Sequence, residues 1–178
     1  MIVNYRMNAG FIPADHWVHG EEGGGRNIGE ACHIYDLFAF LTEGTPLRVH
    51  AESISAAGKQ WNSNDNFIAT VAFSDGSLCS LTYTALGSRS FAKERMEIFC
   101  DGMVIELDDY RSLKVTGRNA SSVTSSSPAK GQFEELQVLG DWLQAPHDAW
   151  PISLSDQLAV SRVAIEIERQ LKPIRADQ

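Results

Sequence analysis

A histidine, His33, comes shortly after three consecutive glycines at 23–25 and stands in a largely apolar stretch. An ionisable side chain in such a stretch needs either a hydrogen-bonding partner or a chemical task. Asp36 is three residues further on, so a helix would place its carboxylate on the same face, where it could orient the imidazole or raise its pKa. The pattern fits proton transfer by His33, and it fits equally a core histidine that hydrogen-bonds a backbone carbonyl.

The glycines raise the question of a phosphate-binding loop. A dinucleotide fingerprint reads G-x-G-x-x-G directly after a buried strand, within a βαβ unit. Here Gly23, Gly25 and Gly29 are spaced one residue too far apart, and the segment before them is polar and aromatic. We therefore expect the glycines to allow tight backbone passage beside a ligand or another domain, rather than to bind a nucleotide on their own.

The segment before the glycines carries His16, Trp17 and His19, with Glu21 and Glu22 close behind. Histidines and carboxylates are metal ligands, but a segment without regular structure does not fix the geometry that a metal site requires. We predict no metal site here and favour a loop that presents Trp17 and polar groups to a sugar-like ligand.

The cysteines predict neither a disulfide framework nor a zinc site, because Cys32, Cys79 and Cys100 are odd in number and far apart. Cys32 is expected to pack as a small apolar group. No serine or cysteine stands in a context that would activate it as a nucleophile. A reducing cytoplasm is the predicted location.

Composition excludes several function classes. The formal net charge of −8 argues against nucleic-acid binding, which needs clustered lysine and arginine. No apolar run approaches the roughly 20 residues that cross a bilayer, and the first residues do not read as a signal peptide. With 178 residues and 43% hydrophobic content, we expect one well-buried domain spanning 1–178.

A first helix should carry His33. Asn27 is expected to be its N-cap and Glu30 the reciprocal partner of a capping box. Apolar residues then recur on one face until Gly44 ends the helix: Ile34, Leu37, Phe38 and Leu41.

From about residue 47 the apolar period changes from helical spacing to two, which predicts strands. After a first strand over 2–10, the expected strands are 48–55, 66–73, 78–86, 95–100, 103–107 and 113–116. Short turns such as Asp75-Gly76 and Asp101-Gly102 indicate an antiparallel meander. Two of these strands are apolar on both sides, so a sheet with helices on one face would need its other face covered by a second subunit.

The remainder predicts a Ser-rich mobile loop over 118–131 and two closing helices. The first helix repeats Phe133, Leu136, Leu139 and Leu143, and Ser155 should cap the second. The predicted fold class is therefore α+β, with a large, mainly antiparallel (mixed) open sheet and helices packed on one face.

The string GGGRNIGEACHIYD at 23–36, together with the preceding Asn8 and Trp17 segment and the long meander, resembles the C-terminal domain of the Gfo/Idh/MocA oxidoreductases. That family includes glucose–fructose oxidoreductase and inositol dehydrogenase. The motif is most similar to that of bacterial members reading GGGR-x-x-GE-x-CH-x-x-D. The likeness spans essentially the whole chain.

The resemblance implies a partner domain and a cofactor. Family members join this domain to an N-terminal Rossmann domain that binds NAD or NADP and is absent from these residues. Hydride passes between the nicotinamide and a carbon of a sugar, cyclitol or similar polyol. The family histidine beside the nicotinamide donates or accepts the proton, and His33 matches it. A homodimer or homotetramer through the sheet is also expected.

One departure from the family pattern stands out. The family's usual aspartate, four residues before the histidine, is Gly29 here, and Glu30 comes one place later. Because a helix turns about 100° per residue, Glu30 does not replace that aspartate geometrically. We expect Glu30 and Asp36 to be supporting residues of the site around His33. The residues expected to grip ligand hydroxyls or an anionic group are Asn8, Trp17, Arg26, Asn27 and Lys93.

Three hypotheses follow. The leading one is the substrate-binding and oligomerisation domain of an NAD(P)-dependent sugar or polyol oxidoreductase, inactive without its cofactor domain. Loss of the aspartate at Gly29 favours a second, a non-catalytic sensor or assembly domain that keeps the fold. A third uses NAD transiently to hydrolyse glycosides through a redox cycle.

Overall fold

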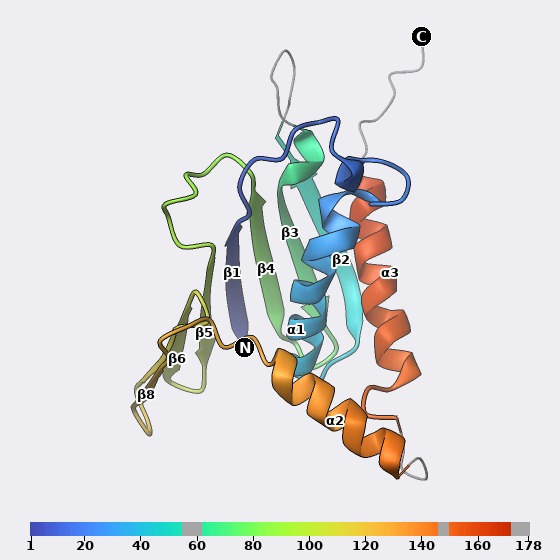
Figure 1. Cartoon of the computed structure of the whole chain (residues 1–178). Coiled ribbons are helices and arrows are strands. Elements are labelled where there is room, and N and C mark those ends of the chain that lie inside the picture. The colour runs from blue at the N-terminus through green and yellow to red at the C-terminus, as the bar shows by residue number, and fades with distance from the viewer. Residues whose placement is uncertain (55–61, 146–149, 172–178) are drawn as a thin grey trace.

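The structure, a computed structural model, describes residues 1–54, 62–145 and 150–171. One eight-stranded sheet runs in the order β2-β3-β4-β1-β5-β6-β7-β8, with helices α1 and α3 on one of its faces (Figure 1). The strands are β1 (Ile2–Asn8), β2 (Pro46–Ser53), β3 (Asn66–Phe73), β4 (Leu78–Thr84), β5 (Glu94–Cys100), β6 (Met103–Asp108), β7 (Ser112–Thr116) and β8 (Ser121–Thr124). The helices are η1 (Trp17–His19), η2 (Asn27–Ala31), α1 (Cys32–Thr42), η3 (Ser63–Asp65), α2 (Gln132–Gln144) and α3 (Leu154–Leu171). The predicted α+β class is confirmed.

The expected antiparallel meander is correct for β2–β3–β4 and for β5–β6–β7–β8, but wrong for the centre of the sheet. There β1 inserts between β4 and β5, parallel to β4 and antiparallel to β5. Short turns force successive strands to be neighbours, whereas the longer segment 85–93 can pass over one intervening strand. Alternating apolar side chains let β1 fill that central place.

Side-chain alternation divides the sheet into a buried and an open face. Val3, Tyr5 and Met7 of β1 are buried, as are the matching residues of the neighbouring strands, and they pack against α1 and α3. The core residues from the helices include Phe38 and Ile167, both 0% exposed.

Strand β8 corrects the expectation of a loop over 118–131. Its four residues pair with β7, although all four side chains are exposed. A strand that buries no side chain leaves no apolar alternation in the sequence, so only the backbone pairing reveals it.

The start of the first helix also differs from the expectation. Asn27 is not an N-cap, and it does not form a capping box with Glu30, because residues 27–31 form one turn of π-helix, η2. The fully buried Asn27 amide instead donates to the Ala164 carbonyl (2.9 Å) and to Glu168 (3.1 Å) and accepts from the Tyr35 hydroxyl (2.8 Å). Tertiary partners therefore replace the local cap and fix η2 to α3.

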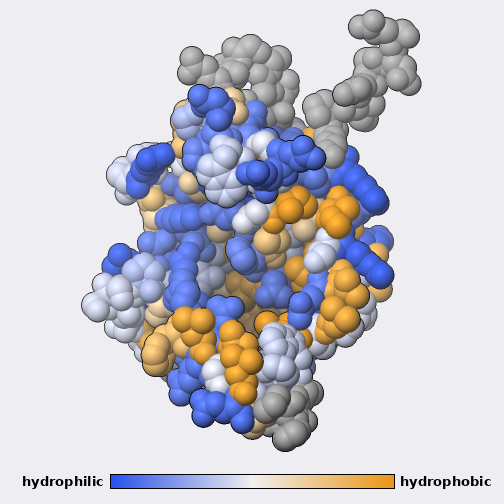
Figure 2. All heavy atoms as spheres, turned by 45° about the vertical axis from the view of Figure 1, so that its right-hand side comes forward, coloured by the Kyte–Doolittle hydropathy of each residue, from blue (hydrophilic) through white to orange (hydrophobic). Residues whose placement is uncertain are grey.

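The two closing helices are present, with two corrections. Ser153, not Ser155, caps α3, because its hydroxyl oxygen accepts from the Asp156 amide at 3.1 Å. Helix α2 buries none of its residues, and Phe133 and Leu136 on it are 76% and 67% exposed. Figure 2, which turns the α3 side forward, shows exposed apolar patches on this part of the surface. Within the described residues, no helix combines the length and hydropathy needed to cross a membrane.

The role of Asn27 gives a stability prediction. Asn27→Ala removes three hydrogen bonds and leaves buried partners on α1 and α3 unsatisfied, so we expect the free energy of unfolding to fall by about 2–4 kcal/mol. Urea denaturation followed by circular dichroism measures the change. Asn4→Ala, on the exposed face of the sheet, is the control and should cost less than about 0.5 kcal/mol. Equal losses in the two variants would contradict the role assigned to Asn27.

Candidate functional site

The Glu30 carboxylate is the centre of a polar cluster at the end of the sheet where β1 and β4 finish. It accepts hydrogen bonds from the Tyr83 hydroxyl, from Arg26 (Nη2–Oε2 2.9 Å) and from Lys93 (Nζ–Oε1 2.7 Å). Burial alone would raise the pKa of Glu30, but the hydrogen bonds from Lys93, Tyr83 and Arg26 outweigh it and lower the pKa from 4.5 to about 2. Glu30 is therefore an anion throughout the neutral range and acts as an acceptor, not as an acid.

Arg26 ties the start of the glycine-rich helix to the end of β1. Its side chain is 3% exposed and donates to the Gly10 carbonyl (2.6 Å), to the Ala9 carbonyl (3.1 Å) and to Glu30. The guanidinium also lies 5.3 Å from the centroid of the Tyr83 ring. Arg26 thus closes the loop that connects β1 to η2, and it neutralises the carboxylate beneath it.

His33 is exposed on the first turn of α1, three residues after Glu30. Within the part of the chain that the structure describes, no hydrogen bond or ion pair holds its imidazole. Asp36 is likewise exposed. The structure therefore contradicts the reading of His33 as a buried core group and leaves its ring free to meet a reactant.

The loop between β1 and η2 carries Trp17, which is 65% exposed. His16 caps the short helix η1 through Nδ1, which accepts from the Val18 amide at 3.3 Å. His19 is largely buried and faces Asp65, with 3.6 Å between Nε2 and Oδ2. Burial raises the pKa of Asp65, and the nearby His19 opposes this rise. His16 and His19 therefore hold in place the loop that carries the exposed Trp17.

The glycine at 23 is needed for close packing and not for binding a phosphate. A Cβ there would lie 2.4 Å from the Val18 carbonyl oxygen, so the loop folds tightly against itself. Strand β2, which follows α1, pairs with β3 and not with β1, so the chain forms no βαβ unit here. Among the described residues, no three His, Cys, Asp or Glu side chains come together as a metal site would require.

The structure brings Arg26, Glu30 and Lys93 into direct contact, with His33 on the adjoining turn. Asn8 is next to them, because its backbone amide donates to the Lys93 carbonyl at 2.7 Å. Its side-chain amide donates to the Ser88 carbonyl (2.8 Å), while its buried Oδ1 has no hydrogen-bond partner. Asn27, in contrast, is fully buried between α1 and α3.

Sequence reasoning missed two members of this region, Tyr83 and Asp65. Tyr83 stands on β4 in the alternating pattern of a core strand, and its ring stacks on Phe67 with centroids 5.2 Å apart. A buried tyrosine needs a partner for its hydroxyl. This requirement indicates that the Tyr83 hydroxyl has a hydrogen-bond partner, but the sequence alone does not identify Glu30 as that partner.

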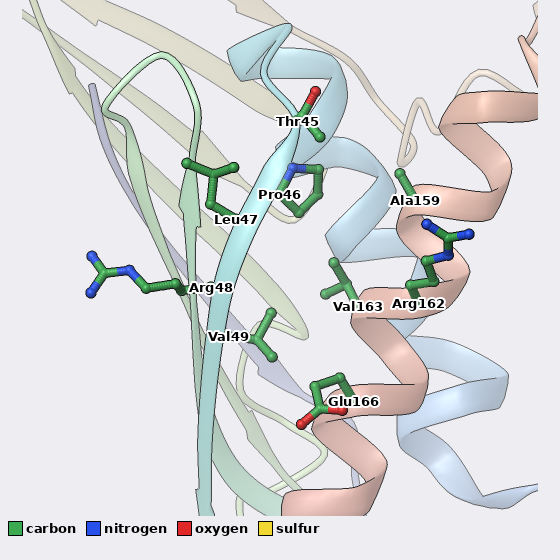
Figure 3. Close-up of a pocket in the computed structure, with 9 residues that line it drawn as sticks. All are labelled: Thr45, Pro46, Leu47, Arg48, Val49, Ala159, Arg162, Val163 and Glu166. Atoms are coloured by element: carbon green, nitrogen blue, oxygen red, sulfur yellow. The ribbon is translucent and has the colours of Figure 1, made fainter.

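A separate groove lies between β2 and α3 (Figure 3), with a volume of about 470 Å³. It contains none of the predicted site residues. Gln170 of α3 occupies the neighbouring edge of β2, where its side-chain amide accepts from the Ala51 amide (2.8 Å) and donates to the Val49 carbonyl (3.4 Å). Pro46 and a register irregularity between Pro46 and Arg48 further block strand addition at this edge.

Comparison with protein-family models matches residues 2–106 to the GFO/IDH/MocA C-terminal domain. The chain belongs to this family. The matched part contains the Glu30 cluster, His33, the strands from β1 to β5 and the first residues of β6. A comparison with curated protein sequences finds no match.

Solved structures share the fold of this GFO/IDH/MocA C-terminal domain. UDP-N-acetylglucosamine 3-dehydrogenase GnnA from Acidithiobacillus ferrooxidans is 19% identical, with a TM-score of 0.71 over 96% of this chain and 55% of that one. Aldose-aldose oxidoreductase from Caulobacter crescentus is 16% identical, with a TM-score of 0.72 over 96% and 52%. An oxidoreductase from Agrobacterium radiobacter, in complex with NAD+, L-tartaric acid and magnesium, is 15% identical, with a TM-score of 0.68 over 98% and 55%. The chain spans about half the length of these proteins.

The lowered pKa of Glu30 predicts how stability depends on pH. The folded value of about 2 lies below the ordinary 4.5, so ionised Glu30 stabilises the fold above about pH 4.5 and loses this effect as the pH falls towards 2. We expect Glu30→Gln to cost roughly 2 kcal/mol at pH 7, and the difference from wild type to shrink across that window.

Urea denaturation at pH 7, 5 and 3 measures this difference. Glu97→Gln is the control, because Glu97 makes an exposed ion pair with Arg95 that contributes little to stability. A Glu30→Gln deficit that stays constant from pH 7 to pH 3 would show that the charge of Glu30 is not what stabilises the cluster.

Proposed function

We propose that this domain binds the substrate of an NAD(P)-dependent oxidoreductase that acts on a sugar, a sugar derivative or a polyol, and that His33 donates or accepts the proton. The observation that carries the proposal is an exposed imidazole without a partner in the described residues, on the turn next to an ionised carboxylate and a half-exposed lysine. An N-terminal Rossmann domain that binds NAD or NADP would complete the enzyme. The domain over 1–178 would not turn over alone, and we place the enzyme in the cytoplasm.

The relatives support this class of chemistry. The names of two of them state action on an amino-sugar nucleotide and on aldoses, and a third is described in complex with NAD+. The glycines at 23–25 are not part of a βαβ unit, because β2 pairs with β3 and not with β1, and we assign the cofactor mainly to another domain. When bound, the nicotinamide would accept or donate the hydride.

In this proposal, different residues of the domain transfer the proton, bind the ligand and position the polar cluster. Oxidising a carbinol needs a base at the hydroxyl, and imidazole suits that task near neutral pH, so His33 takes the proton. Glu30 remains ionised and can only accept a hydrogen bond from a ligand hydroxyl. Lys93, whose side chain is 44% exposed, can donate to a hydroxyl oxygen. Arg26 and Asn27 have their donors occupied inside the domain, so we assign them to positioning the cluster. Asn8 and Trp17 complete the proposed ligand contacts.

The protein that joins this domain to its cofactor domain tests the role of His33. We expect His33→Asn to lower kcat by about 100-fold or more, because general acid–base catalysis contributes at least that much. The melting temperature should stay unchanged, because the side chain is exposed and makes no hydrogen bond to the described residues. His50→Asn, another exposed histidine, is the control.

The same assay separates the alternatives. Unchanged turnover in His33→Asn would remove the catalytic assignment. Absence of any NAD(P)-dependent turnover in the wild type, with ligand binding retained, would favour the sensor that the glycine at 29 suggests. Glycoside hydrolysis without net accumulation of NADH would favour the transient redox cycle.

We also propose that the open face of the sheet joins two copies of the chain. One row across this face is apolar from β3 to β6, and within it Ile2, Leu78 and Phe99 are 51%, 47% and 44% exposed. Exposed apolar residues in a continuous row are typical of an interface.

Multi-angle light scattering tests this interface. We expect the wild type to be a dimer or tetramer and Leu78→Glu to shift it to the monomer, since a buried carboxylate in an apolar row is strongly unfavourable. Leu136→Glu is the control, because Leu136 is likewise apolar and exposed but belongs to helix α2 and not to this row of the sheet. An unchanged mass for Leu78→Glu would contradict an interface through this row.

A further inference from the structure

A row of side chains crosses the covered face of the sheet beside the Glu30 cluster. Phe67, Tyr83, Met7 and Glu94 are direct neighbours in register on β3, β4, β1 and β5, and all four are buried. Glu30 stands over Tyr83 at one point of this row, and Glu94 is at its end. Because neighbouring strands are about 4.8 Å apart, the backbones of Tyr83 and Glu94 are separated by roughly 10 Å. Although no helix lies in front of β1 and β5 in Figure 1, other side chains cover this part of the row, because Met7 and Glu94 are only 4% and 2% exposed.

Glu94 is a second buried carboxylate, 2% exposed, with its own set of partners. It accepts from the Tyr5 hydroxyl and forms an ion pair with Lys130. Burial raises the pKa of Tyr5, so its hydroxyl stays neutral and donates. A carboxylate this deep needs such partners, because an unpaired buried charge is strongly destabilising.

Lys130 is held in one place but is not enclosed. Its ammonium lies 5.1 Å from the centroid of the Tyr110 ring, and its side chain is 37% exposed. The backbone around it is fixed as well, because the Ala129 amide donates to the Tyr110 carbonyl at 2.9 Å and the Ser125 amide to the Arg111 carbonyl at 2.7 Å. An ammonium has three donors, and Glu94 takes one of them in this arrangement. The others are available to a ligand.

Lys130 is outside the part of the chain that the family model matches, which ends at residue 106. Its anchor, Glu94, is inside that part.

We propose that Lys130, positioned by Glu94, is a second contact for the ligand that binds at Glu30 and Lys93, and that it selects a hydroxyl-rich ligand long enough to reach both lysines. This proposal rests on the proposed function. Each of the two lysines already has a carboxylate partner, Lys93 in Glu30 and Lys130 in Glu94. Glu30 is shared by Arg26 and Lys93, whereas Lys130 is paired one to one with Glu94. Lys130 therefore adds no unbalanced positive charge, which favours a neutral hydroxyl oxygen over a phosphate or a carboxylate at this position.

The test is ligand binding to the chain itself, followed by two-dimensional NMR. The probes are myo-inositol, D-glucose, D-glucuronate and UDP-N-acetylglucosamine. The main variant is the double substitution Glu94→Gln with Lys130→Met, which removes both charges together and so leaves no unpaired buried carboxylate. Lys114→Met, an exposed lysine on β7, is the matched control. Melting temperatures verify that each variant is folded.

We expect the double variant to weaken binding of a neutral probe about tenfold, the loss of one hydrogen bond from a charged donor, with the control unchanged. In the protein with its cofactor domain, KM should rise by a similar factor while kcat is retained, in contrast to His33→Asn. Wild-type affinity in the double variant would overturn the Lys130 contact and leave the proposed function standing. A tenfold effect confined to D-glucuronate or UDP-N-acetylglucosamine would overturn the preference for a neutral oxygen. Failure of all four probes to bind the wild type would overturn both proposals.

Discussion

The constraint on which this domain depends is the need to neutralise a carboxylate, Glu30, where the sheet meets its first helix. One of the three groups that do so is local, Arg26 from the preceding turn, and two come from distant parts of the chain, Tyr83 from β4 and Lys93 from the segment before β5. Each of them would be costly to bury or order alone. Together they fix η2 against the strand ends, and that contact determines where α1 begins and therefore where His33 is presented.

The same principle recurs at two further places, and at each a buried polar side chain connects an earlier element to a segment later in the sequence. Asn27 uses its amide to join η2 to α3, across 137 residues to Ala164. Glu94 uses its carboxylate to hold Lys130 and the segment that leads to α2. Apolar packing does not distinguish well between neighbouring registers of a helix on a sheet, whereas a buried polar group that must be satisfied accepts few arrangements. These contacts define one geometry for the end of the sheet that carries the polar cluster.

The sequence predicted what depends on local periodicity and missed what depends on partners far along the chain. The alternation in β3, β4 and β5 located these strands to within two residues. Residue type and context singled out His33 as a candidate, whereas Glu30 was expected mainly as part of a capping box. The predicted capping box does not form, because the Asn27 side-chain amide donates hydrogen bonds to α3 and not to the first turn of its own helix. The place of β1 between β4 and β5 depends on strand pairing, which no local pattern encodes. Tyr83 and Lys130 belong to the polar clusters through contacts with carboxylates far away in the sequence, Glu30 and Glu94. The residues next to them in the sequence therefore do not indicate this role.

The arrangement is compatible with the proton transfer proposed for His33, although a glycine stands at position 29. A carboxylate near the imidazole serves best when it remains charged, because it then accepts from hydroxyls without competing for the proton. Glu30 is in this state, since Lys93, Tyr83 and Arg26 keep its pKa near 2. Its longer side chain and the π-helical turn at 27–31 direct the carboxylate to the strand ends rather than along α1. Residue 29 is an exposed glycine, and the carboxylate of the next residue, Glu30, is anchored to the strand ends through Tyr83 and Lys93.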